Sequence, residues 1–334
     1  MAQRRISRCC LGLVVLACSL FAQSRCCARE WEWLNPQPFG ANLSAAWGSA
    51  PDDIWFCSDA GTLQHWDGTG FSRFETGGRY TTRLRDVHGI ASDNIMTVGH
   101  NQAFLWDGVS WSDVSPGSPT IDFHSVWGAP TGEYYASAYH GWIWRYVDGI
   151  WYSHQISYYF DPRSLSGTAA DDVYVAGYSY PLIQNVYHWD GESWTSVGDT
   201  HDYAFMAVWE FATNNVWAAG EDGQIFRWDG NVWNWHDPGV PYGLTLHALW
   251  GSHADSVYIA GLGGYLFHWD GASMSSFRAA DAGRRVFAGL WGFSESDVWA
   301  VGGQGLLYHY DGAAWTNRQT GALDFLNGDR KSVV

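Results

Sequence analysis

The sequence predicts an all-β fold, namely a seven-bladed β-propeller of four-stranded antiparallel blades. The first observation behind this prediction is a repeat of about 41 residues that fills most of the chain. A fixed period near 40 residues is typical of propellers, in which each repeat forms one blade. Every copy contains an Asp-Gly pair, and successive pairs are 40, 41, 42, 39, 41 and 41 residues apart, with the aspartates at Asp67, Asp107, Asp148, Asp190, Asp229, Asp270 and Asp311. The second observation is an aromatic content of 17% with 23 tryptophans, because each blade must bury its apolar faces against its neighbours.

The last copy shows how each repeat divides into four strands. Residues 286–291 alternate into an apolar first strand, and a polar turn at 293–296 leads to a second strand at 297–301. Residues 302–305 form a glycine turn before a third strand at 306–310. Asp311-Gly312 is the hairpin turn into a fourth strand that begins at Trp315. No apolar period of 3.6 residues follows the N-terminal segment, so the pattern predicts strands throughout.

Residues 1–28 lie outside the repeat and have the pattern of a secretory signal peptide. An apolar stretch at 11–22 follows Arg4, Arg5 and Arg8, and small residues suited to cleavage lie at 22–28. An alternative is a lipoprotein signal that ends at Cys18, which would then carry a lipid anchor. Both interpretations predict export, so that the protein is secreted, periplasmic or on the cell surface. The predicted organisation is a signal peptide at 1–28, a propeller at 29–321 and a C-terminal tail at 322–334.

The two ends of the repeat region leave the closure of the ring open. Residues 30–49 resemble residues 232–252, so the N-terminal segment is expected to hold a fourth strand that could complete the last blade. The last copy, however, supplies its own fourth strand at Trp315. Residues 323–334 could begin a truncated eighth copy. Seven blades are our prediction, and eight blades are the alternative.

The chain without its first 28 residues is acidic and holds one cysteine. Removing residues 1–28 leaves 14 basic against 34 acidic side chains, a net charge near −20. Such a surface disfavours nucleic acid and anionic membranes as partners. We expect a monomer without a membrane span. Cys57 alone of the six cysteines lies outside 1–28, so no internal disulfide is expected and Cys57 is predicted to be a small buried side chain.

The third and fourth copies differ from the others by an excess of tyrosine. In a four-stranded blade, the turns between the second and third strands share a face with the links from the fourth strand to the next blade. Aromatic side chains in these turns and links are expected to line one mouth of the ring as a ligand site: Tyr139, His140, Trp142, Tyr158, Tyr159, Tyr178, Tyr180 and Tyr203. The alternative is that tyrosine replaces tryptophan as filler between blades, which we expect at strand positions such as Tyr134 and Tyr146.

Other recurring polar residues indicate structure rather than chemistry. Each Asp-Gly pair offers one carboxylate, too few for a calcium ion, and we expect it to hydrogen-bond its own turn. One strand position before the Asp-Gly pair is shared by several residue types and is interpreted as a tolerant site rather than a ligand: it holds His65, His188, His268 and His309 but also Leu105, Arg145 and Arg227. No catalytic residue, metal site or cofactor is predicted.

The motif at 291–315 resembles the propeller repeats of secreted and surface bacterial proteins. It contains Trp-Gly, Asp-Val-Trp-Ala-Val-Gly, a glycine turn and Tyr-Asp-Gly-x-x-Trp, and the likeness covers residues 30–321. The Asp-Gly-x-x-Trp ending is also similar to the Asp-box of sialidase-like propellers, but it is one residue shorter and lacks the leading Ser or Thr. WD-repeat and kelch propellers are more distant likenesses. The resemblance implies the fold and no particular activity.

Three functions fit these observations. The one we favour is an exported, non-catalytic binding module for a glycan or a surface protein at the aromatic mouth. The second is an envelope scaffold that binds proteins through a flat face. The third is a polysaccharide-active enzyme, since some secreted propellers are lyases that use histidine and tyrosine as base and acid. His140 with Tyr139 or Tyr159 would take these roles, and the basic candidates for neutralising the substrate are Arg145, Arg163 and Arg227.

Overall fold

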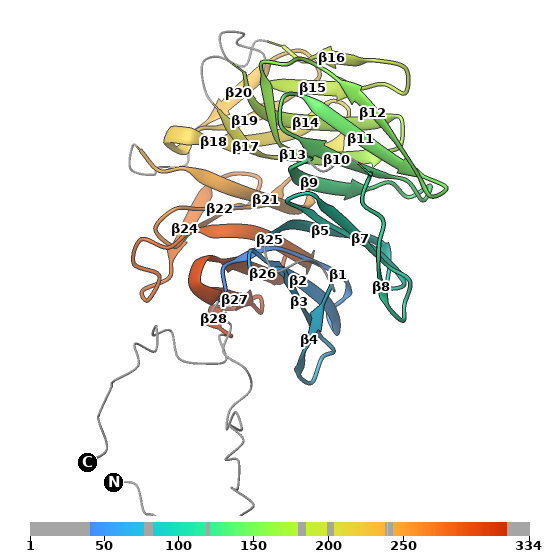
Figure 1. Ribbon diagram of the computed structural model, residues 1–334. Coiled ribbons are helices and arrows are strands. Elements are labelled where there is room, and N and C mark those ends of the chain that lie inside the picture. The colour runs from blue at the N-terminus through green and yellow to red at the C-terminus, as the bar shows by residue number, and fades with distance from the viewer. Residues whose placement is uncertain are drawn as a thin grey trace, which may run out of the picture. The chain divides into compact units, whose positions relative to one another are not determined.

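The computed structural model describes residues 41–76, 83–117, 121–179, 185–198, 204–237, 239 and 243–318. These residues form seven four-stranded antiparallel sheets around a common axis (Figure 1). The chain is a seven-bladed β-propeller. The predicted fold class and the number of blades are therefore confirmed for this part of the chain. The expected signal peptide at 1–28, the expected N-terminal strand after residue 30 and the tail at 322–334 lie outside the described residues.

Each blade is built from four consecutive strands, and the first strand of each blade lies innermost, beside the first strands of the neighbouring blades. Blades one to four are β1 (Leu43–Ala50), β2 (Asp53–Ser58), β3 (Thr62–Trp66) and β4 (Phe71–Glu75); β5 (Leu84–Ala91), β6 (Asn94–Gly99), β7 (Gln102–Trp106) and β8 (Trp111–Asp113); β9 (Phe123–Gly128), β10 (Tyr134–Ala138), β11 (Trp142–Val147) and β12 (Ile150–Gln155); β13 (Phe160–Ala169), β14 (Asp172–Ser179), β15 (Val186–Trp189) and β16 (Trp194–Ser196). Blades five to seven are β17 (Phe205–Ala212), β18 (Asn215–Gly220), β19 (Ile225–Trp228) and β20 (Trp233–His236); β21 (Leu246–His253), β22 (Ser256–Gly261), β23 (Tyr265–Trp269) and β24 (Met274–Arg278); β25 (Phe287–Ser294), β26 (Asp297–Gly302), β27 (Leu307–Tyr310) and β28 (Trp315–Asn317).

The last blade matches the strands predicted for it, with two differences. Its first strand β25 runs on to Ser294, so the polar turn is shorter than expected. The glycine turn contracts into a single 3-10 turn, η2 (Gly303–Gly305), in which Gln304 and Gly305 are left-handed with φ of 53° and 71°. Gly302 is instead extended and belongs to β26. A similar turn, η1 (Glu221–Gly223), stands at this position in blade five.

The Asp-Gly pairs are hairpin turns between the third and fourth strands, as predicted. In six of the seven, one carboxylate oxygen accepts hydrogen bonds from the backbone N–H groups two and three residues later. In Asp67 the hydroxyl and N–H of Thr69 and the N–H of Gly70 lower the pKa to about 2. Asp148 differs, because it is itself left-handed (φ 50°) in a tighter turn. The interpretation of these aspartates as turn residues is confirmed.

Aromatic side chains fill the spaces between blades, and several also carry a hydrogen bond to the next blade. Tyr134 is 1% exposed, and its hydroxyl donates to the carbonyl of Asn94 at 2.7 Å. The filler role expected for Tyr134 is confirmed. The ring closes where β25 of the last blade lies beside β1 of the first (Figure 1). There Trp291 Nε1 donates to the carbonyl of Gly48 at 3.0 Å. The last blade has four strands of its own, so closure within the described residues depends on packing between complete blades.

Two further expectations concern single features of the chain. Cys57 lies fully buried in the interface between the first two blades, as predicted, and burial raises the pKa of its thiol. Among the described residues, none belongs to a helix with the length and hydropathy that crossing a membrane requires.

Candidate functional site

The two faces of the propeller are built from different segments. Because the four strands of a blade alternate in direction, the turns between second and third strands lie on the same face as the links between blades. We call this the link face, and the opposite one, which carries the Asp-Gly turns, the hairpin face. The candidate site lies on the link face.

A β-bulge recurs near the start of every innermost strand. The register of each inner strand against its neighbour shifts by one residue there. An extra residue in one strand bends the strand locally and changes the direction of its side chain. All seven bulged residues line the central channel, and we call them the collar: Ser44, Arg85, His124, Arg163, Met206, His247 and Ala288. The collar therefore sets two arginines and two histidines around the mouth of the channel.

Aromatic rings close the channel beyond the collar. The ring of Trp291 lies 5.9 Å from that of Trp47, 5.7 Å from His88 and 6.4 Å from Trp209. These residues come from the first, second, fifth and seventh blades, so the rings meet across the axis. Burial lowers the pKa of His88 to about 4, which keeps this ring uncharged. A space of about 160 Å³ remains in the channel. A ligand therefore reaches the collar from the link face.

An aromatic shelf lies beside the collar on blades three and four. Five of its rings are exposed, with exposed fractions of 62% for Tyr158, 61% for Tyr159, and 37–39% for the other three, which are Tyr139, Trp142 and Tyr178. The sixth member is His140, whose ring stacks on Tyr158 at 4.7 Å with 3° between the planes. Tyr159 meets Tyr158 edge to face at 5.7 Å. These six residues are those that we predicted for the mouth and that the structure describes.

The turn that holds His140 is fixed by its backbone. His140 and Gly141 are both left-handed, with φ of 60° and 72°. A Cβ atom at Gly141 would lie 2.0 Å from the carbonyl oxygen of Ser157, so only glycine lets the turn and the following link approach this closely. The carbonyl of Gly141 accepts from the N–H of Ile156 at 2.9 Å, and the carbonyl of His140 accepts from Gln155 Nε2 at 2.9 Å. Hydrogen bonds therefore fix the backbone that carries the stacked pair of His140 and Tyr158.

Tyr139 joins the shelf to the collar. Its ring lies 5.8 Å from the guanidinium carbon of Arg85 and 5.9 Å from that of Arg163. His124 meets the same ring at 4.1 Å, close to perpendicular. Contacts of an arginine with an aromatic face at this distance are attractive. Tyr139 is therefore held by three collar residues from three blades.

The histidine at this junction is neutral. Burial, with the charges of Arg85 and Arg163, lowers the pKa of His124 to about 3. Its Nδ1 lies 2.8 Å from the carbonyl of Pro162 and must donate to it, since a carbonyl only accepts. The two arginines are each paired with a carboxylate, Arg85 with Asp122 at 2.8 Å and Arg163 with Asp161 at 2.5 Å. The charge of the collar thus comes from the arginines.

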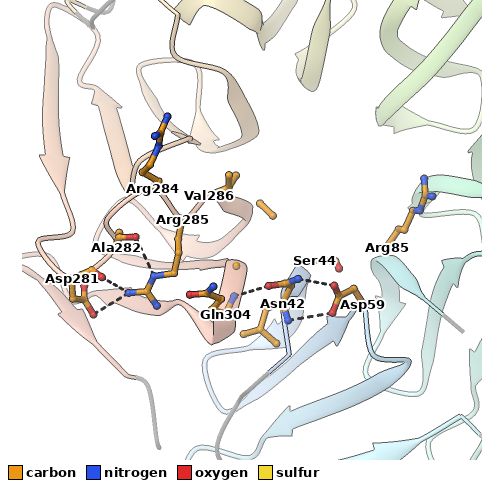
Figure 2. A pocket seen from close by; sticks show the side chains of 13 residues that line it. Asn42, Ser44, Asp59, Arg85, Asp281, Ala282, Arg284, Arg285, Val286 and Gln304 are labelled. Carbon is orange, nitrogen blue, oxygen red and sulfur yellow. Dashed lines mark hydrogen bonds and ion pairs between the residues drawn. The ribbon is translucent and has the colours of Figure 1, made fainter. Parts of the chain in front are cut away.

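A larger cavity adjoins the collar between the seventh, first and second blades. It has a volume of about 1010 Å³. Figure 2 shows Arg284 and Arg285 on the link before β25, with Arg85 across the cavity from them. Asn42 lies between, where its Oδ1 accepts from the N–H of Gln304 at 2.7 Å and its Nδ2 donates to Asp59 at 2.7 Å. The cavity is therefore lined by three arginines drawn from two distant parts of the sequence.

The remaining predicted residues lie elsewhere. Tyr180 and Tyr203 lie outside the described residues. Arg145 and Arg227 are not close to the shelf, because their Nε atoms donate to Glu133 at 2.7 Å and to Asn215 at 2.9 Å toward the hairpin face. The same strand position holds the four histidines discussed above, and there His65 and His309 pair with Asp53 and Asp297, each at 2.7 Å. This position has a structural role, and the recurring pair makes it more specific than the tolerant site that we expected.

Of the collar, the sequence-based prediction named only Arg163. Arg85, His124 and Arg163 follow one another at intervals of 39 residues, each near the start of an inner strand, so the repeat itself contains the signal. Aligning the seven repeats and comparing the residues at each equivalent position would have revealed this recurring set of basic side chains. Nothing in the sequence shows that a bulge turns these side chains into the channel.

No protein-family model matches this sequence, and no curated protein matches it. Solved structures share the fold. A structure of YCF48 bound to a D1 peptide has a TM-score of 0.67 at 17% identity and covers 84% of this chain and 94% of that one. A structure of a catalytically inactive virginiamycin B lyase from Staphylococcus aureus with quinupristin has a TM-score of 0.70 at 11% identity and covers 82% of this chain and 96% of that one. The WD40 β-propeller domain of Doa1 has a TM-score of 0.68 at 9% identity, and the match covers 82% of this chain and 93% of that one. At these identities the likeness concerns the fold alone.

Proposed function

We propose that this chain is an exported, non-catalytic binding module that holds a partner on the link face over blades three and four. The aromatic shelf carries this proposal, because Tyr158 and Tyr159 are more than half exposed on a link that is fixed by hydrogen bonds. Exposed tyrosine rings supply large contact areas at a low cost in conformational entropy, and they are enriched where proteins bind. A rigid surface of this kind is suited to recognition.

Two classes of ligand suit the shelf, and we favour a protein segment at the cell surface. Sugar faces stack on tyrosine rings, which makes a glycan the second candidate. Similarity in fold to YCF48 bound to a peptide and to a WD40 domain supports the protein segment. The arginines that adjoin Tyr139 also suit the mixed polar and aromatic composition of protein interfaces.

The geometry supports binding over lyase chemistry. Tyr139, His140 and Arg163 do approach one another, with 6.3 Å between the two rings and 5.9 Å from Arg163 to Tyr139. However, His140 is stacked on Tyr158, and the ring of Tyr139 is contacted by His124 and two arginines. Neither Tyr139 nor His140 lines the channel or the arginine cavity. A base and an acid directed at one substrate atom would need a common space.

The binding test compares Tyr158→Ala and Tyr159→Ala with Tyr152→Ala. Tyr152 is the matched control, since it is 55% exposed on the outer strand of the same blade. Each protein is presented with surface proteins of the source cell and with a panel of polysaccharides. We expect a ligand that the wild type and the control retain, and that both shelf variants bind at least about tenfold more weakly.

The other outcomes decide against all or part of this proposal. Equal binding by the shelf variants and the wild type would favour a scaffold that uses another face. Polysaccharide cleavage that is lost in His140→Ala would establish an enzyme. A ligand that proves to be a glycan would keep the module and change its partner.

Export is the second part of the proposal, and the arginines and apolar stretch within residues 1–28 support it. N-terminal sequencing of the protein from separated cell fractions tests it. We expect an N-terminus near residue 29 in the envelope or the medium. A lipid-modified N-terminus at Cys18 would assign a surface anchor, and an intact N-terminus in the cytoplasm would contradict export.

A further inference from the structure

We propose that the arginines of the link face bind the carboxylate groups of an acidic peptide segment. The site consists of the cavity that Arg284, Arg285 and Arg85 line, together with the adjoining collar. This inference rests on the proposed function, because it gives the chemistry of the partner that the shelf would hold. It has its own test, which does not involve the shelf.

Two of these arginines have donors without a partner among the described residues. Arg284 is exposed and makes no hydrogen bond or ion pair within the described part of the chain. Arg285 has a side chain only 11% exposed, and its Nε donates to the carbonyl of Ala282 at 3.1 Å. Its Nη2 donates to the carbonyl of Asp281, but its Nη1 is buried without a hydrogen-bond partner among the described residues. A buried unpaired donor is unfavourable, and a ligand oxygen at this position would satisfy it.

The third arginine connects the cavity with the channel. Arg85 lines both spaces, and its pairing with Asp122 and its contact with Tyr139 fix its position. A guanidinium held in one place loses little entropy when it binds, and its planar donors match a carboxylate. Arg85 therefore links the three features: it lines the cavity, belongs to the collar and contacts Tyr139 of the shelf.

The charge of the cavity favours a carboxylate over a dianion. The whole chain has a formal net charge of −16, yet the cavity is lined by three arginines against the carboxylates of Asp59 and Asp281. Asp59 accepts from Asn42, and Asp281 accepts from Asn317 at 2.8 Å, so both carboxylates are already hydrogen-bonded. The side chains that line the cavity sum to one net positive charge, and Asp122, the partner of Arg85, lies outside the lining. A single carboxylate matches this charge, while a phosphate dianion would exceed it.

The arrangement favours a peptide over a polyuronate. Acidic peptides can present a carboxylate and an apolar side chain within a few residues, and here an arginine cavity and an aromatic shelf meet at the contact between Arg85 and Tyr139. A polyuronate carries a carboxylate on every ring and would need cations along the whole shelf. The described shelf residues include no lysine or arginine.

The test measures binding of a hexaglutamate peptide to the full chain by calorimetry. Hexaglutamine, hexagalacturonate and inorganic phosphate serve as comparison ligands. We expect hexaglutamate to bind, to weaken as salt is raised, and to lose affinity about fivefold in Arg284→Gln and more in Arg284→Glu. Arg284 is exposed, so these variants should fold. The control is Arg73→Gln, which removes another exposed arginine charge, from β4, and should leave affinity within about twofold.

Three results would overturn the inference. These are equal affinity for hexaglutamate and hexaglutamine, wild-type affinity in Arg284→Glu, and tighter binding of phosphate or hexagalacturonate than of hexaglutamate. If the proposed function fails, Tyr158→Ala binds the partner as tightly as the wild type does. If the present inference fails, Arg284→Glu binds hexaglutamate as tightly as the wild type does.

Discussion

The guanidinium carbon of Arg85 lies 5.8 Å from the centre of the Tyr139 ring, and its Nη2 lies 2.8 Å from a carboxylate oxygen of Asp122. Arg85 belongs to the second blade and Tyr139 to the third, so this contact crosses a blade boundary. Arg163 of the fourth blade approaches the same ring at 5.9 Å. Tyr139 is thus the point at which three blades, the collar and the shelf meet.

A double-mutant cycle of Arg85→Gln and Tyr139→Leu should detect this contact. We expect a coupling free energy of about 0.5–1 kcal/mol, the usual range for a partly exposed cation–π pair. Urea unfolding of the wild type, both single variants and the double variant measures it. The control cycle pairs Arg73→Gln with Tyr139→Leu and should be additive. Additivity in both cycles would show that the contact contributes nothing to stability.

Replacing Gly141 should disrupt the base of the shelf. Gly141→Ala places a side chain at φ 72° and 2.0 Å from the carbonyl oxygen of Ser157, so the turn and the link must separate. The control is Gly149→Ala, which is equally left-handed (φ 81°) but has open space around the new Cβ. We expect the control to lose about 1 kcal/mol of unfolding free energy and Gly141→Ala at least about 2 kcal/mol more. Equal losses in urea unfolding would mean that the close approach is unimportant.

The fold could be predicted because its signals are local and repeated. An Asp-Gly pair such as Asp311-Gly312 specifies its hairpin by hydrogen bonds within four residues. The pair recurs in all seven copies of the repeat. Strand ends were less predictable: β25 runs to Ser294 because pairing with Asp297 of β26 extends the ladder beyond the apolar run. That pairing depends on the partner strand and is not visible in the segment alone.

The candidate site could be predicted only in part. The positions of Tyr158 and Tyr159 followed from which strands they connect, and the structure places both on the predicted face. The arginine cavity could not be foreseen, since Arg85 and Arg285 are 200 residues apart and meet only because the ring closes. Interblade distances of this kind are set by the packing of whole blades.

A buried carboxyl group predicts how stability depends on pH. Burial and the nearby negative charge of Asp172 raise the pKa of Glu210 to about 10. Burial alone would also raise the pKa of Asp172, but hydrogen bonds from Thr213, His188 and Thr168 hold it below the usual value. Glu210 therefore binds a proton on folding at neutral pH. Its contribution to stability is fully present below the unfolded pKa near 4.5 and is lost as pH rises toward 10.

Glu210→Gln should remove this dependence. The amide is neutral at every pH, so we expect the variant to gain about 1–3 kcal/mol over the wild type at pH 8 and little at pH 4.5. Urea unfolding at several pH values measures the difference. The control is Glu192→Gln, an exposed carboxylate in the same region, which should follow the wild-type profile. A variant less stable than the wild type at pH 8 would show that the buried carboxylic acid is needed for packing.

The tyrosine hydroxyls that cross blade boundaries should each contribute to the stability of the ring. Tyr134 donates to the carbonyl of Asn94 at 2.7 Å and lies 3.0 Å from its side-chain oxygen, so Tyr134→Phe leaves a partly buried carbonyl with one partner fewer. We expect a loss of about 1 kcal/mol in urea unfolding with an unchanged slope. The control is Tyr146→Phe in the same blade, where the half-buried hydroxyl has no hydrogen bond among the described residues. If both variants lose the same free energy, the effect comes from desolvation of the ring, and the hydroxyl of Tyr134 does not hold neighbouring blades together.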